Sequence, residues 1–319
     1  MSTLPSVGVT LPRDLPAADV LPYARRAEEL AFASVWVIED LGFRGGFAQA
    51  GAVLAATSTI HVGLGIVPAA ARNAAFTAME AATLSVLFPG RFSLGVGHGV
   101  PSWMRQVGAW PRSPLGLLGE HLSTVRDLLH GRTVTRTGDH VDVDGLVLAE
   151  PPARPPAVLA GVRGPRSLAL AGRLADGTLL AEPVTPQYAA RAREQIGAPG
   201  PHTLTGYLHT VVDEDPARAR ATVRPALEWY GEPDCAAHVA PSPYAAELAA
   251  LRGRCADGAE FATRMPDAWV DDLALVGTPR RVRDRLGELA AGGLDAVVLI
   301  PVGGDRLAGL DGLAAATLG

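Results

Sequence analysis

The chain has 319 residues, of which 48% are hydrophobic and 5% aromatic, and its formal net charge is −5 at pH 7. This length allows a large core, and the charge gives no reason to expect nucleic-acid or membrane binding. All 28 basic residues are arginine, so Schiff-base chemistry on a lysine is excluded, and any phosphate must be held by arginine, backbone N–H groups or hydroxyls.

The two cysteines, Cys235 and Cys255, have no metal-binding spacing and do not indicate a disulfide framework, so no metal site is expected. The first residues show no basic region followed by an apolar core, and no apolar run is long enough to span a bilayer. We therefore expect a cytoplasmic protein that acts on a small molecule.

Eight short apolar runs predict β-strands, with helical patterns between them. These runs are Val7–Thr10, Ser34–Ile38, His61–Val67, Phe92–Val96, Pro156–Ala160, Thr178–Ala181, His202–Val212 and Asp295–Pro301. The alternation predicts a single α/β domain over residues 1–319, a (β/α)8 TIM barrel. Two insertion segments depart from the repeat: a β-hairpin near 132–148 and a helical segment near 231–272.

Two acids, Glu39 and Asp40, follow the second predicted strand. Loops at the carboxyl ends of barrel strands build active sites, so both are candidate site residues. A helix N-cap or a loop carboxylate is the alternative. Earlier in the chain, Asp19 is expected to cap the first helix.

The β-α-β unit His61–Gly99 is the central motif of the chain. Its helix, Ala74–Leu87, is expected to face the core through residues at i, i+3 and i+7, which are Met79, Ala82 and Val86. Arg72 and Asn73 follow the first strand and His98 the second, so these polar residues are expected at one edge of the barrel. The next segment, Pro101–Leu117, is expected to be a long connection that acts as a lid or ligand wall.

A glycine-rich turn, Gly161-Val162-Arg163-Gly164-Pro165-Arg166-Ser167, follows the fifth predicted strand. Pro165 suits the first turn of a helix, and helix N-termini bind anions through free backbone N–H groups. Arg163, Arg166 and the Ser167 hydroxyl would add to such a phosphate site. Gly164 is expected to have a positive φ or to allow close approach of the anion. An ordinary tight strand-to-helix turn is the alternative.

Ordered motifs over nearly the whole chain resemble the luciferase-like flavin and deazaflavin oxidoreductases. They are Gly65-Ile66-Val67-Pro68, Arg72-Asn73, Pro89-Gly90-Arg91-Phe92, Gly95-Val96-Gly97-His98-Gly99 and the turn Gly161–Ser167. The resemblance implies a bacterial luciferase-like barrel, a cofactor phosphate held at that turn, and a homodimer. The small-residue helices Phe47–Thr57 and Ala74–Leu87 offer flat apolar faces for the dimer.

A narrower resemblance is to the branch that uses coenzyme F420, which includes methylenetetrahydromethanopterin reductase-like enzymes. It depends on Glu39-Asp40, Gly65-Ile66, His98-Gly99-Val100-Pro101 and Trp103-Met104. In that branch a bulge, often with a non-prolyl cis peptide, presses on the cofactor ring, and Gly65-Ile66 takes its place here. The implied cofactor-binding residues are Asp40, Gly65, Ile66, Val67, Pro68, Arg72, Asn73, Gly97, His98, Gly99, Trp103, Ala160, Gly161, Val162, Arg163, Gly164, Pro165, Arg166 and Ser167.

Family members that oxidise sugar phosphates differ from this chain at two places. They have Asp-His after the second strand, where this chain has Asp40-Leu41, and a Glu where it has Val100. Their lysine phosphate ligands cannot exist here, so that substrate class is excluded.

The resemblance implies hydride transfer between F420 and a small organic substrate. His98 is the first candidate for catalytic proton donor or substrate orienter, because histidine titrates in the range such a role needs; a role only in holding the cofactor stays open. Glu39 is the second candidate. The alternatives are an FMN-dependent monooxygenase and a flavin- or deazaflavin-binding protein without turnover.

Overall fold

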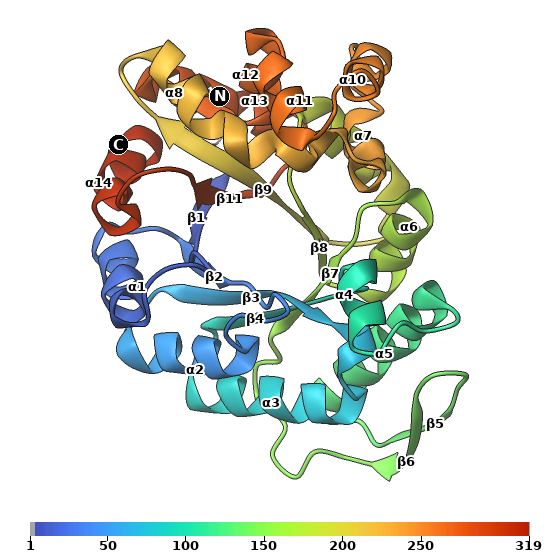
Figure 1. Cartoon of the computed structure of the whole chain (residues 1–319). Helices are drawn as coiled ribbons and strands as arrows, with labels where there is room; N and C mark the ends of the chain where they lie inside the picture. Colours follow the sequence, from blue (N-terminus) through green and yellow to red (C-terminus); the bar gives the residue numbers. More distant parts are fainter. Residues whose placement is uncertain (1–3, 319) are drawn as a thin grey trace.

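The computed structural model describes residues 4–318, and its centre is a closed barrel of eight parallel strands (Figure 1). The order around the barrel is β9–β11–β1–β2–β3–β4–β7–β8, and β8 pairs back to β9. The strands are β1 (Ser6–Thr10), β2 (Ser34–Val37), β3 (His61–Pro68), β4 (Phe92–Gly97), β7 (Ala157–Gly161), β8 (Gly177–Leu180), β9 (Thr203–Val212) and β11 (Ala296–Pro301). This confirms the predicted (β/α)8 fold.

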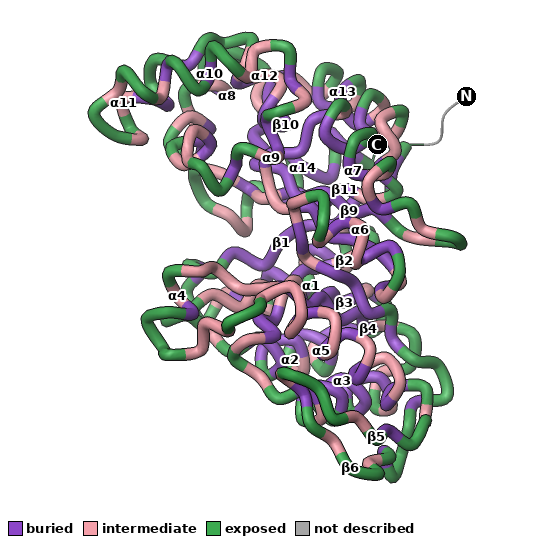
Figure 2. The backbone as a smooth tube through the Cα atoms, turned by 90° about the vertical axis from the view of Figure 1, so that its right-hand side faces the viewer, coloured by how far each residue is buried: buried purple, intermediate pink, exposed green. Residues whose placement is uncertain are grey.

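Helices pack around the outside of the barrel, and the strands are the most deeply buried part of the molecule (Figures 1 and 2). The surrounding helices are α1 (Val20–Glu29), α2 (Gly46–Ala56), α3 (Ala74–Leu87), α5 (Pro114–Leu129), α6 (Pro165–Leu174), α7 (Pro186–Ile196), α13 (Pro279–Ala291) and α14 (Arg306–Thr317). Several begin with a side-chain cap followed by proline, as at Thr185 and Thr278, because the cap accepts a free N–H and proline needs none.

Two expectations about the helices were wrong. Asp19 makes no side-chain cap; a 3-10 turn, Ala17–Asp19, leads into α1 instead. Met79 does not face the core, because its side chain is 48% exposed, and the buried face of α3 is built on smaller residues such as Ala78 and Ala81.

A two-stranded antiparallel sheet, β5 (Val134–Thr137) with β6 (Asp142–Leu146), lies outside the barrel. The Glu120 carboxylate on α5 anchors its turn by accepting hydrogen bonds from three successive backbone N–H groups, those of Asp139, His140 and Val141. The connection after β4 contains a short helix, α4 (Pro101–Gln106), which the sequence analysis did not predict.

A helical segment follows β9 and forms a second hydrophobic cluster with Leu227, Tyr230, Cys235, Phe261 and Val270 at its centre. Its elements are α8 (Pro216–Val223), η3 (Arg224–Gly231), η4 (Pro233–Cys235), α9 (Ala236–Val239), α10 (Ala245–Arg252), α11 (Gly258–Arg264) and α12 (Asp267–Leu273). An unpredicted strand, β10 (Leu275–Gly277), joins this segment to β9 by pairing with residues 210–212. The single-domain assignment and its insertion boundaries stay predictions.

Large side chains from one side of the barrel fill space left by glycines on the other. Trp36 on β2 and Tyr207 on β9 meet edge to face inside the barrel, with ring centroids 5.8 Å apart. A Cβ atom on Gly63 would lie 2.3 Å from the Trp36 ring, and one on Gly65 would lie 2.3 Å from the Tyr207 hydroxyl. Glycine is therefore required at both positions of β3, because Trp36 lies over its neighbour Gly63 and Tyr207 reaches Gly65 from across the barrel.

No helix within residues 4–318 is long and apolar enough to cross a membrane. The same part of the chain contains no cluster of three or more His, Cys, Asp or Glu side chains that could hold a metal ion.

Candidate functional site

The predicted site residues follow β2, β3, β4 and β7, at the carboxyl ends of neighbouring parallel strands. Pro68 pairs with Gly97 across β3 and β4, and Gly97 pairs with Gly161 across β4 and β7. The structure therefore brings the ends of the three motifs side by side at the C-terminal mouth of the barrel, the end where barrel enzymes build their sites.

A bulge interrupts β3 just below this mouth. The peptide bond between Gly65 and Ile66 is cis, as the resemblance implied, and the pairing with β4 shifts register between Leu64 and Val67. The Ile66 side chain lies over two neighbouring glycines: a Cβ on Gly161 would be 2.4 Å from its Cγ2, and one on Gly97 would be 2.6 Å from its Cδ1. Both glycines are needed for Ile66 to occupy this position.

The turn after β7 leads directly into α6, with Pro165 in the first helical turn. The first helical hydrogen bond runs from the Leu168 N–H to the Gly164 carbonyl, so the N–H groups of Arg166 and Ser167 have no backbone acceptor within residues 4–318. The Arg166 side chain is exposed and makes no ion pair or hydrogen bond with that part of the chain. Free donors of this kind at a helix N-terminus are the groups that attract anions in other proteins.

The expectation that Gly164 uses a positive φ was wrong. Its φ is −94° and its ψ is 157°, an extended conformation that any residue can adopt. A Cβ at this position would meet no atom within 4 Å. Close approach of an anion is the remaining reason for glycine here.

His98 joins the end of β4 to the turn Gly161–Ser167, the turn predicted to hold a phosphate and called the phosphate turn below. Its Nε2 lies 3.0 Å from the Ser167 hydroxyl, at hydrogen-bonding distance. Burial lowers the pKa of His98, and the positive charge of Arg163 lowers it further, while the Pro114 carbonyl opposes the shift. The imidazole is therefore held mainly neutral near pH 7, and it can exchange a proton or a hydrogen bond with a ligand at this turn.

Glu39 and Arg72 bind each other rather than remaining free for a ligand. The Arg72 guanidinium donates to both oxygens of Glu39, at 3.1 and 2.7 Å, and also to Glu80 at 3.0 Å. The Gly46 N–H at the start of α2 donates to the same Glu39 carboxylate at 2.6 Å. This network fixes the loop after β2, and Asp40 beside it accepts a hydrogen bond from Arg13.

Two other predicted ligands are engaged in local structure. The Asn73 amide oxygen caps α3 by accepting from the N–H groups of Ala75 and Phe76. Arg163 donates to the Asp234 carbonyl at 3.0 Å, which ties the turn to the helical segment. Trp103 lies on α4, partly buried.

A buried pair of polar side chains, one on β9 and one on η3, was not predicted from the sequence. Nδ1 of His209 lies 2.7 Å from the Tyr230 hydroxyl, and both side chains are buried. The signal that could have found His209 is the alternation Thr205, Tyr207, His209 along a long strand, which places all three on one face.

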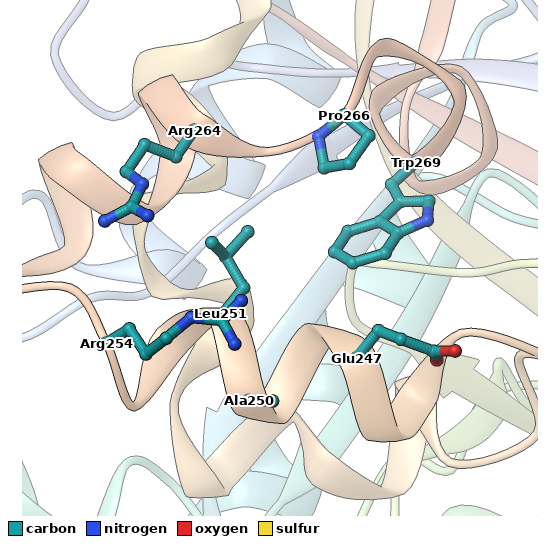
Figure 3. Close-up of a pocket in the computed structure, with 7 residues that line it drawn as sticks. All are labelled: Glu247, Ala250, Leu251, Arg254, Arg264, Pro266 and Trp269. Carbon is teal, nitrogen blue, oxygen red and sulfur yellow. The ribbon is translucent and has the colours of Figure 1, made fainter.

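Two surface cavities lie away from these residues. One of about 200 Å³, between α10 and the start of α12, has Trp269 and Pro266 facing α10, with Arg254 and Arg264 at one end (Figure 3). The other, of about 420 Å³, lies along α1 and α2 beside Arg44 and Gln49. Neither contains a residue predicted for the site.

Residues 1–296 match the family model described as luciferase-like monooxygenase. The chain is 27% identical over 303 residues to the 5,10-methylenetetrahydromethanopterin reductase of Methanolobus tindarius, which covers 91% of this chain and 93% of the relative. The coenzyme F420-dependent tetrahydromethanopterin reductase of Methanopyrus kandleri superposes with a TM-score of 0.82 at 19% identity, over 99% of both chains. An F420-dependent secondary alcohol dehydrogenase, solved with an F420–acetone adduct, has a TM-score of 0.77 at 21% identity, over 99% of both chains.

Proposed function

Because the chain belongs to the luciferase-like monooxygenase family, we propose that it is an oxidoreductase that transfers a hydride between coenzyme F420 and a small organic substrate. The observation that carries the proposal is the contact between His98 and Ser167. It joins a proton-exchanging side chain to a helix N-terminus with free N–H groups. A homodimer and a cytoplasmic location are part of the same proposal.

The residues present fit an anionic cofactor with a flat ring. The N–H groups of Arg166 and Ser167 and the Arg166 guanidinium would hold its phosphate. Ile66, raised by the bulge over Gly97 and Gly161, would support the ring from behind. The names of the reductase relatives support F420 over FMN for this role.

When bound, the deazaflavin supplies the hydride chemistry, and the protein supplies binding, orientation and proton exchange. His98 is the proposed proton donor or orienter at the substrate, because it lies beside the phosphate turn and its ring, mainly neutral, still carries one N–H that can donate a hydrogen bond. Glu39 is not free for proton transfer in this arrangement, since Arg72 and the Gly46 N–H occupy its oxygens. Its proposed role is to hold the loop that carries Asp40.

The test is a titration of the purified protein with F420 and, separately, with FMN, followed by fluorescence. We expect F420 to bind more tightly than FMN. We expect Arg166→Ala to weaken F420 binding by about tenfold to a hundredfold, because a charge-assisted hydrogen bond contributes about 1.5–3 kcal/mol. The loss should shrink at high salt.

The matched control is Arg173→Ala, which removes an exposed arginine from the other end of α6. It should leave F420 affinity unchanged. Tighter binding of FMN would favour the monooxygenase alternative, and F420 binding without oxidation of its reduced form by any acceptor would favour a carrier. Equal affinity in wild type and Arg166→Ala would place the phosphate elsewhere.

A further inference from the structure

His209 lies on the interior face of β9, on the side of the barrel mouth away from β3 and β4. It follows Tyr207 by two residues, and Tyr207 packs inside the barrel against Trp36. Its register partner on β11 is Ile300, which also packs on this interior cluster. Side chains alternate between the two faces of β9, so His209 shares the interior face with Tyr207, and its pairing with Ile300 gives the same result. The His209 imidazole therefore points into the barrel, one layer closer to the mouth than Tyr207.

The Tyr230 hydroxyl determines which nitrogen of His209 carries the proton. Tyr230 is fully buried, and Nδ1 of His209 is the one hydrogen-bond partner of its hydroxyl within residues 4–318. Burial and the charge of Glu182 raise the pKa of Tyr230 well above its usual value, so the phenol keeps its proton. Because Nδ1 is the one partner of this hydroxyl, donation to Nδ1 is the arrangement that leaves no buried phenol hydrogen unpaired. In the neutral imidazole, Nδ1 is then the acceptor and Nε2 carries the hydrogen.

The charged groups around His209 leave it neutral near pH 7. Burial lowers its pKa, the Glu182 carboxylate after β8 opposes this shift, and Arg306 at the start of α14 reinforces it. Among the described residues the His209 ring makes its hydrogen bond through Nδ1, and Nε2 is not one of the fully enclosed atoms that lack a partner. The residue as a whole is 9% exposed, so it is not completely closed off from the mouth.

We propose that the Nε2–H of His209 is the hydrogen-bond donor that holds an oxygen of the substrate, on the opposite side of the mouth from the phosphate turn. Tyr230 acts through His209 as a positioning residue that fixes its tautomer. The proposal rests on the proposed function, because it divides the mouth into a cofactor side at His98 and Ser167 and a substrate side at His209.

The side chains around this position indicate the class of substrate. Ile300 beside His209 is apolar, and Tyr207 and Tyr230 carry uncharged hydroxyls, so a neutral donor here suits a carbonyl or hydroxyl oxygen. The Glu182 carboxylate acts on His209 more strongly than the Arg306 guanidinium, which disfavours a phosphate or carboxylate at this point. We therefore assign a substrate that presents an uncharged carbonyl or hydroxyl oxygen at this position.

The test is nitrogen-15 NMR of the histidine rings in the full-length protein, with the His209 signals assigned by their loss in His209→Gln. We expect the neutral Nε2–H tautomer in wild type and a mixture of both tautomers in Tyr230→Phe. Acetone is then titrated into the protein with and without F420 as a neutral carbonyl probe. We expect a saturable shift of the His209 Nε2 signal, and weakening of acetone binding by at least about tenfold in His209→Leu.

Three outcomes would overturn the proposal: an Nδ1–H tautomer in wild type, no shift of His209 with acetone, or unchanged acetone affinity in His209→Leu. His202, whose ring bonds to Thr178 near the amino end of β9, is the control that should not shift. F420 affinity measured by fluorescence should stay within about twofold in His209→Leu. If F420 does not bind to the wild-type protein, the proposed function fails. The tautomer of His209 and the acetone titration without cofactor are independent of that result, and they still decide the role of His209.

Discussion

The two halves of the barrel fill its interior in opposite ways. Strands β3, β4 and β7 place several glycines inside it beside the aliphatic Ile66 and Leu159, whereas β2 and β9 place the aromatic Trp36 and Tyr207 there. Neighbouring side chains make glycine necessary at these positions, since the nearest atom to a Cβ at Gly63 belongs to Trp36. A glycine motif in this barrel is therefore one half of a packing arrangement whose other half lies elsewhere in the sequence.

The largest expected effect comes from placing a methyl group in the glycine half. In Gly63→Ala the new Cβ would lie 2.3 Å from the Trp36 ring, which is rigid and enclosed. We expect the free energy of unfolding to fall by about 3 kcal/mol, the upper range for overpacking a core. Denaturant unfolding measures it.

The double variant Gly63→Ala/Trp36→Leu tests whether the two halves are coupled. It should regain a large part of the loss, because the smaller side chain makes room for the methyl group. Gly309→Ala is the control, since a Cβ there meets no atom within 4 Å in helix α14. Additive losses in the double variant would contradict the coupling.

The next largest effect is a pH dependence that comes from one histidine in the helices around the barrel and one in the helical segment after β9. Burial lowers the pKa of His121, on α5, and of His238, on α9, to about 4 each. The unfolded chain binds these protons near pH 6.5, so stability is complete above that pH and is lost as the pH falls toward 4. Each histidine can account for about 3 kcal/mol of that loss.

Unfolding measured at pH 7.5 and pH 5 in wild type, His121→Asn and His238→Gln checks this dependence. Each substitution should flatten the slope, because it removes one group that takes up a proton only on unfolding. A slope that is unchanged in both variants would mean that other groups control the acid transition.

Much of the barrel half that carries the site motifs was predictable from the sequence. Strand β3 and the turn Gly161–Ser167 have local signals, because buried apolar runs, glycines and a helix-starting proline depend on neighbours in the chain. The partners of Glu39 and Arg163 were not predictable, since Arg72 and Asp234 reach them from other elements. Strand β10 was missed because a three-residue strand has no period of its own and exists by pairing with β9.

A smaller effect is expected on self-association. Met79 lies on the exposed face of α3 and not on its core face, which enlarges the apolar surface available to a second copy. Phe76, Met79 and Leu87 leave 65%, 48% and 64% of their surfaces exposed on α3. If a second copy covers this face, Phe76→Ser should raise the dimer dissociation constant by about tenfold or more, as expected for an aromatic residue in an interface.

Sedimentation at micromolar concentration measures this association. Phe43→Ser is the matched control, because Phe43 is comparably exposed but lies on the loop after β2. A wild-type monomer at that concentration would contradict the proposed homodimer.

The smallest effect is expected at Arg163, which the sequence analysis treated as equivalent to Arg166. Its guanidinium is bonded to the Asp234 carbonyl, so Arg163→Ala should change F420 affinity by no more than about threefold. The free energy of unfolding should fall by about 1 kcal/mol through the lost hydrogen bond. A loss of affinity as large as that in Arg166→Ala would assign both arginines to the phosphate.

Strand β9 is hydrogen-bonded to three other strands along its ten residues: β8 at its start, β11 along most of its length, and β10 at its end. Its carboxyl end therefore belongs at once to the barrel and to the helical segment that follows. Each backbone amide in this strand exchanges with solvent deuterium when its own hydrogen bond opens, so the pairings with β11 and with β10 can be followed separately. Equally slow exchange in residues 205–209 and 210–212 would indicate that the segment carrying Tyr230 opens together with the barrel, so that His209 keeps its hydroxyl partner for as long as the barrel stays folded.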